Sequence, residues 1–231
     1  MTHTAKTNTK KGSVHTIALA RKVRLLLWGG AYATSDNHTF ERAKREVTKD
    51  YKQSDNNTLE IIDVRIDSAQ EFIATINKQK VNSIRSLDVF THGGPDHLYM
   101  VSVREENNGG FNNFRWYRYA VHNASLSRPD LSKIQFSNFT NEAKIEFQGC
   151  QTAANPTDED NIAADFSRRL KEAGKIKSSV IGHTTNAVPG IDADDKPRQD
   201  YRHGSRAIFK GGRLIKLTKQ KGAIDEKWLT Q

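Results

Sequence analysis

Cysteine is nearly absent from this chain: its 231 residues contain one, Cys150. A single cysteine cannot form a disulfide within the chain, and it cannot build a zinc site made of cysteines. The thiol is therefore either an inert part of the core or a reactive group. Residue type alone favours the inert role, because free cysteines are among the most buried side chains. The residues around Cys150 have to show which of the two roles it has.

Long apolar runs are also absent. No stretch of 18 apolar residues occurs, so we expect no membrane span. No apolar segment precedes residue 23, so no secretory signal is visible. We therefore expect a cytoplasmic protein, or one exported without a visible N-terminal signal. Residues 1–20 carry few large apolar side chains and are expected to be flexible, which leaves 21–231 as a single domain.

Acidic residues are outnumbered: 36 Lys and Arg stand against 27 Asp and Glu, and the formal net charge is +9. Such a balance permits binding to nucleic acid or to an acidic membrane surface. The basic residues are scattered, however, and form neither a basic helix nor an aromatic-basic RNA motif. A basic, solvated surface is the favoured interpretation. A nucleic-acid-binding α/β domain remains a more distant alternative.

The residues that are present predict strands that alternate with helices along the chain. A nearly continuous apolar run at 23–28 predicts a strand buried on both faces. In the segment 144–149, apolar Ile145 and Phe147 alternate with polar Glu146 and Gln148, which also predicts a strand. The full set of predicted strands is 23–28, 59–64, 86–91, 144–149 and 178–183. Between them we predict helices at 38–52, after Asp67 or Ser68, and from Asp160 to Glu172, the first capped by Asp36 or Asn37.

Two β-hairpins complete the predicted elements. One joins 98–103 to 114–121 through a turn at 107–110, and the other spans 206–217. Alternating strands and helices favour a mostly parallel sheet with helices on both faces. The sequence therefore predicts one α/β domain.

Four predicted strands end in glycines and reactive side chains: Gly29-Gly30, His92-Gly93, Gly149-Cys150 and Gly182-His183. The carboxyl ends of parallel strands share one edge of a sheet, where α/β proteins place their sites. Glycine ends strands for conformational reasons alone, but this does not explain a cysteine and two histidines at the same edge. We therefore expect His92 and Cys150 on adjacent parallel strands, with His183 as a possible third site residue.

A cysteine nucleophile needs a base that generates thiolate, and donors for the developing oxyanion. His92 can supply the base. The N–H of Gly93 can approach a substrate carbonyl closely because Gly93 has no side chain, and the N–H of Cys150 can be the second donor. The spacing therefore fits a Cys–His hydrolase.

The stretch Gln148-Gly149-Cys150-Gln151-Thr152, with His92-Gly93 after a strand 58 residues upstream, resembles the caspase-like cysteine peptidases. In the caspase signature Gln148, Cys150 and Gln151 have counterparts. Gly149 stands in place of alanine, which is similar to separases and to the self-cleaving domains of bacterial toxins, and Thr152 replaces a glycine. The resemblance implies a three-layer sandwich and peptide hydrolysis, including self-processing. It also implies His92 as base or acid, Cys150 as nucleophile, and Gly93 with the Cys150 amide as oxyanion hole.

By the same resemblance, Gln148 lines the pocket for the substrate residue before the cleaved bond, and no cofactor is implied. Asp192, Asp194 and Asp195 follow the strand 178–183 and are candidates for the same pocket. A negative loop there would favour Lys or Arg in a peptide or protein substrate. If Arg198 or Arg202 turned inward instead, the preference would reverse toward acidic residues.

Other interpretations remain open. His92, Asp96 and His97 are possible metal ligands, but a further strong ligand at proper spacing is missing. His92-Gly93-Gly94 is similar to a lipase oxyanion motif, yet the chain has no Gly-x-Ser-x-Gly. We expect a peptidase of bacterial type. The main alternative is an inactive caspase-like module that serves as a binding or effector domain.

Overall fold

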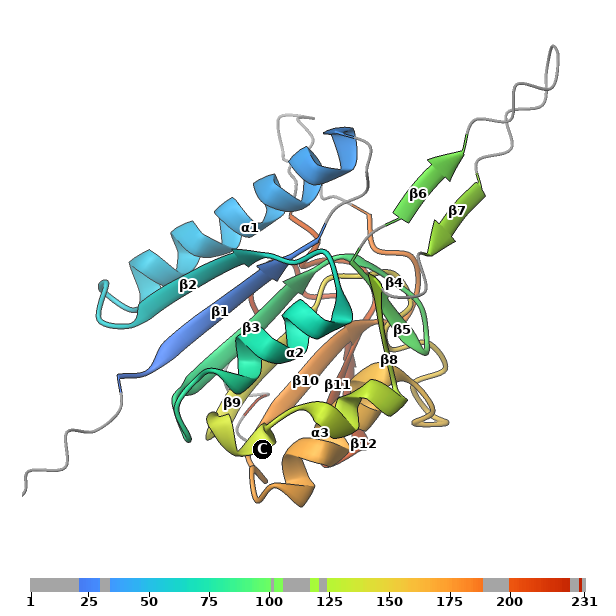
Figure 1. Ribbon diagram of the computed structural model, residues 1–231. Coiled ribbons are helices and arrows are strands. Elements are labelled where there is room, and N and C mark those ends of the chain that lie inside the picture. Colours follow the sequence, from blue (N-terminus) through green and yellow to red (C-terminus); the bar gives the residue numbers. More distant parts are fainter. Residues whose placement is uncertain are drawn as a thin grey trace, which may run out of the picture.

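The computed structural model describes residues 21–29, 34–100, 102–105, 117–120, 124–188, 200–224 and 229. Its centre is a seven-stranded sheet in the order β12-β11-β10-β9-β3-β1-β2 (Figure 1). The strands are β1 (Val23–Trp28), β2 (Glu60–Arg65), β3 (Ile84–Phe90), β9 (Phe139–Phe147), β10 (Ser179–His183), β11 (Arg206–Lys210) and β12 (Arg213–Thr218).

The sheet is mostly parallel. β1 pairs in parallel with β2 and β3, and β9 pairs in parallel with β3 and β10. Only β11 and β12, the predicted closing hairpin, run antiparallel to their neighbours. The chain leaves β1 for β2 on one side and then passes β1 to form β3 on the other. In such sheets ligands bind at the carboxyl ends of the strands where the order reverses, which is here the end of β1 and β3.

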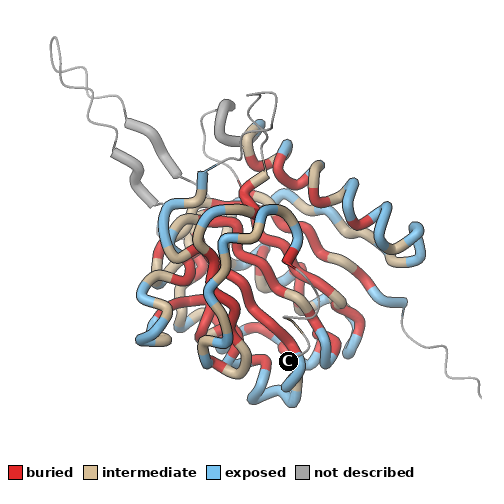
Figure 2. The backbone as a smooth tube through the Cα atoms, turned by 180° about the vertical axis from the view of Figure 1, so that it is seen from behind, coloured by how far each residue is buried: buried red, intermediate tan, exposed pale blue. Residues whose placement is uncertain are grey.

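Helices cover both faces of the sheet, which confirms the predicted three-layer α/β architecture and is consistent with a caspase-like sandwich. α1 (Thr34–Ser54) packs on one face, where Phe40, Val47 and Tyr51 meet Leu26 and Phe90. α2 (Ala69–Asn77) and α3 (Ile162–Glu172) cover the opposite face (Figure 1). The main apolar core lies between these two helices and the sheet, and the buried segments of Figure 2 follow the central strands.

Helix boundaries agree with the sequence where a cap is visible in it. The Ser68 side chain accepts a hydrogen bond from the Glu71 N–H and caps α2, and the Glu71 carboxylate accepts one from the Asp67 N–H, one residue before the cap. Asn161 caps α3, and its side-chain oxygen accepts a hydrogen bond from the Ala164 N–H. The predicted cap of α1 is wrong, because α1 begins at Thr34 and therefore includes Asp36 and Asn37.

The predicted hairpin at 98–103 and 114–121 is only partly correct. β6 (Ser102–Glu105) pairs with β7 (Tyr117–Ala120) as expected. Leu98, however, belongs to β5 (His97–Tyr99), which pairs with β4 (His92–Gly93) and with β8 (Ser125–Ser127) in a separate sheet. The turn at 107–110 and the leading residues 1–20 lie outside the described residues.

Two short 3₁₀ helices, Pro129–Lys133 and Phe136–Asn138, lead into β9. β9 is longer than predicted, because it begins at Phe139. No helix among the described residues is long and apolar enough to cross a membrane.

Candidate functional site

The segments that carry His92 and Cys150 follow two adjacent parallel strands. β3 and β9 pair in register, with Val89 beside Phe147, and the Gln148 N–H donates to the Val89 carbonyl over 2.9 Å. His92 lies two residues past the end of β3, in β4, and Cys150 lies three residues past the end of β9. The topology therefore brings both residues to one edge of the sheet, beside the point where the strand order reverses.

Two glycines allow the backbones after these strands to touch. A methyl group on Gly149 would stand 3.1 Å from the Gly93 Cα and 3.0 Å from the Thr91 carbonyl oxygen. A methyl group on Gly93 would stand 2.8 Å from the Cys150 carbonyl oxygen and 2.7 Å from Thr152 Cγ2. Each glycine is therefore required by close approach of the other segment.

We predict that Gly149→Ala lowers the free energy of unfolding by about 1–3 kcal/mol, because backbone atoms on the opposite segment cannot yield as a side chain would. The matched control is Gly94→Ala, whose new methyl group would meet only the Tyr99 side chain, at 3.3 Å or more. Urea denaturation of both variants measures the difference. Equal midpoints for the two variants would show that the Gly93–Gly149 contact is not tight.

Cys150 is half-buried, and its Sγ lies 3.7 Å from the Ala187 carbonyl oxygen, which the thiol can reach as a weak donor. The turn that holds it is joined to the segment after β10, because the Gln151 N–H donates to the Thr185 carbonyl over 2.9 Å. Gln151 adopts a φ of 55°, the left-handed conformation that non-glycine residues avoid. Among the described residues the Cys150 N–H has no backbone acceptor, so it is available as an oxyanion donor.

His92 is positioned by helix α1. Its imidazole packs edge-to-face on Phe40, with ring centroids 5.0 Å apart and an interplanar angle of 83°. Phe40 in turn contacts the Tyr201 ring at 6.2 Å. Neither aromatic contact has a signal in the local sequence around His92, so these supporting residues were missed by the sequence analysis.

Gln148 and His183 are both buried, on neighbouring strand ends. No described residue hydrogen bonds to the Gln148 amide or to His183 Nε2. Burial lowers the pKa of His183 to about 4, so its imidazole is neutral near pH 7. Thr152 links the turn to β10: its hydroxyl accepts from the His183 N–H at 3.2 Å and donates to the Gly149 carbonyl at 3.2 Å.

The other predicted site residues are less well defined. Asp192, Asp194, Asp195 and Arg198 lie outside the described residues. Asp96 pairs with Arg128 at 3.2 Å, and His97 stacks on Tyr99. Within the part of the chain that the structure describes, no group of three His, Cys, Asp or Glu side chains is placed to hold a metal ion, and His92, Asp96 and His97 do not form one.

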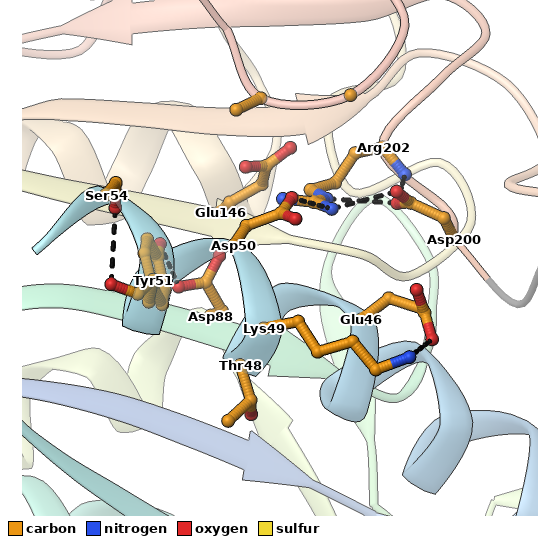
Figure 3. Close-up of polar contacts among 12 residues, drawn as sticks. Glu46, Thr48, Lys49, Asp50, Tyr51, Ser54, Asp88, Glu146, Asp200 and Arg202 are labelled. Carbon is orange, nitrogen blue, oxygen red and sulfur yellow. Dashed lines mark hydrogen bonds and ion pairs between the residues drawn. The ribbon is translucent and has the colours of Figure 1, made fainter. Parts of the chain in front are cut away.

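A network of buried charges lies under α1 on the central strands (Figure 3). The Tyr51 hydroxyl donates to Asp88 over 2.6 Å, Lys144 lies 2.9 Å from Glu146, and Arg206 donates to Glu146 over 2.6 Å. Burial raises the pKa of Asp88 and favours its protonated form, whereas Lys144 and Arg206 outweigh burial and hold the pKa of Glu146 at about 2. The alternating pattern of 144–149 indicates that one face of β9 is polar. It does not indicate that this polar face is buried.

Comparison of the chain with protein-family models, with curated proteins and with solved structures finds no match in any of the three. The candidate site therefore has to be judged on its own chemistry.

Proposed function

We propose that this protein is a caspase-like cysteine peptidase that hydrolyses peptide bonds with a Cys150–His92 dyad. The observation that carries the proposal is the contact between the two strand ends, in which Gly93 and Gly149 let the backbones after β3 and β9 approach within van der Waals distance. Covalent catalysis requires a base near the nucleophile, and neighbouring carboxyl ends of parallel strands can supply that proximity.

In the proposed reaction His92 accepts the thiol proton, and the Cys150 thiolate attacks the substrate carbonyl carbon to form a tetrahedral oxyanion. The N–H groups of Cys150 and Gly93 stabilise this oxyanion. Its collapse expels the amine, which receives the proton from His92, and leaves a thioester. Water then adds to the thioester with His92 as base, which releases the carboxylate product and restores the thiol.

The experiment that tests the proposal is a screen of thiol-directed peptide probes that differ in the residue before the cleaved bond, applied to the wild type and to Cys150→Ala. We expect at least one probe to label the wild type at Cys150 and none to label the variant. If no probe labels the wild type faster than a free thiol of the same concentration reacts, the alternative of an inactive caspase-like binding module is favoured.

For specificity, we predict that Lys or Arg is preferred before the cleaved bond. The proposed pocket combines the uncharged Gln148 with Asp192, Asp194 and Asp195. Arg202, the candidate for an acidic preference, has a buried side chain that is paired with Asp50 of α1 at 2.7 Å and with Asp200 at 2.8 Å, so these ion pairs hold its guanidinium against α1.

The measurement is cleavage of matched fluorogenic peptides that end in Arg, Lys or Asp, repeated with Asp192→Asn, Asp194→Asn and Asp195→Asn. These variants should reduce cleavage after Arg and Lys. Efficient cleavage after Asp that the variants leave unchanged would reverse the specificity and leave the dyad as proposed.

A further inference from the structure

A cavity of 520 Å³ opens on the α1 face, and the candidate peptidase site contributes none of its described lining residues. Its walls are the last turns of α1, the amino-terminal halves of the central strands, and the residues Ala223, Ile224 and Leu229. It therefore lies toward the amino ends of the parallel strands, away from Cys150. A volume of this size is within the range of pockets that bind small molecules. The network of buried charges described above adjoins it, because Tyr51 and Lys144 belong to both.

The charged side chains that line this cavity are mainly cationic. Arg24, Lys144 and Arg202 line it from inside, and Asp50 and Glu142 are the two carboxylates on its wall among the described residues. The other carboxyl groups that contact these cations, those of Asp55, Asp88, Glu146 and Asp200, are not among the residues that line the cavity. A molecule in the cavity therefore meets Arg24 and Lys144 without their ion-pair partners, whereas Arg202 lines the cavity together with its partner Asp50.

Two of the inner cations retain donors. Lys144 Nζ donates to the Tyr51 hydroxyl at 3.3 Å and lies 2.9 Å from Glu146, but neither Glu146 Oε2 nor Asp88 Oδ1 has a partner in hydrogen-bond geometry. An ammonium carries three donors, so this contact set does not exhaust it. Arg202 donates through Nε and Nη2, and its Nη1 has no acceptor among the described residues. Burial would lower the pKa of Lys144, but Glu146, Tyr51 and Asp88 raise it, so the side chain stays charged.

The remaining wall is apolar. Ile176, Ile224 and Leu229 line the cavity together with the Tyr51 ring. From this combination we propose that the cavity is a binding site for a small organic anion, with a carboxylate or phosphate head on Lys144 and Arg202 and a compact apolar body against Ile224 and Leu229. Charge-assisted hydrogen bonds from buried cations hold the head, and the apolar wall discriminates against inorganic ions.

The test is isothermal titration calorimetry of the full chain with benzoate and phenyl phosphate, with benzyl alcohol as the uncharged analogue. We expect at least one of the two anions to bind, and benzyl alcohol to bind at least about tenfold more weakly, as the loss of a charge-assisted hydrogen bond implies. Lys144→Met should weaken anion binding by a similar factor. No binding of either anion at millimolar concentration, or equal binding of benzyl alcohol, would overturn the proposal.

Because Lys144→Met also alters the buried network, a second variant is needed. Ser54→Phe places a ring in the cavity from the last residue of α1 and leaves both cations in place. This variant should abolish anion binding while unfolding at a urea concentration close to that of the wild type. Anion binding that persists in folded Ser54→Phe would assign it to the basic surface and contradict the proposed site.

Discussion

Replacing His92 with alanine should lower kcat/KM for the preferred peptide by about 10²–10⁴-fold, the usual contribution of a positioned general base. The loss should be mainly in kcat, because His92 acts on the thiol and leaving group rather than in binding. Cys150→Ala should remove activity altogether, since no other cysteine exists in the chain.

The matched control for this prediction is His97→Ala. His97 lies in β5, five residues further along, and stacks on Tyr99 rather than on Phe40. This variant should retain near wild-type activity. A comparable loss in both histidine variants, or no loss in His92→Ala, would remove His92 from the mechanism.

Replacing Glu146 with glutamine should lower the free energy of unfolding by about 3–5 kcal/mol, because it leaves buried cations without their counter-ion. Glu146 is fully buried in β9 and pairs with Arg206 at 2.6 Å and with Lys144 at 2.9 Å. The matched control, Glu142→Gln, lies in the same strand in an exposed pair with Lys177 and should change stability by less than about 1 kcal/mol. Similar urea midpoints for the two variants would contradict this role of Glu146.

The pKa of Glu146 also predicts how the stability of the fold falls at acid pH. Burial alone would raise the pKa of Glu146, but Lys144 and Arg206 hold it at about 2, below the ordinary value of 4.5. A carboxylate with a lowered folded pKa contributes stability above its unfolded pKa and loses it as the pH falls toward the folded value. The contribution of Glu146 is therefore complete above pH 4.5 and is lost between about pH 4.5 and 2.

The sheet is predictable from the sequence because its strands are marked by apolar runs and by the glycines that end them. β1 coincides with the predicted 23–28, and β10 begins one residue later than predicted. The prediction for 98–103 is wrong because this mostly apolar segment carries no mark where the chain passes from β5 to β6. That passage lies beside Gly29, where a methyl group would stand 2.6 Å from the Met100 carbonyl oxygen, and such a contact is not visible in either segment alone.

The candidate site, like the sheet, is only partly predictable from the sequence. The adjacency of the strands that lead to His92 and Cys150 follows from the order of strands and crossovers. The partners of these residues do not: the Ala187 carbonyl near the thiol and the Phe40 ring against the imidazole come from distant segments. The buried charges on β3 and β9 were likewise missed, because the pairing of Glu146 with Arg206 joins residues 60 positions apart.

The measurement that tests the dyad most directly is the rate at which iodoacetamide alkylates Cys150 at pH 6, in the wild type and in His92→Ala. An ordinary thiol, with a pKa of about 8.5, is almost fully protonated at this pH. If His92 activates the thiol, Cys150 should react faster than free cysteine in the wild type, and His92→Ala should slow the reaction toward the rate of free cysteine. Equal rates in the two proteins would mean that His92 does not activate Cys150 and would contradict the proposed peptidase mechanism.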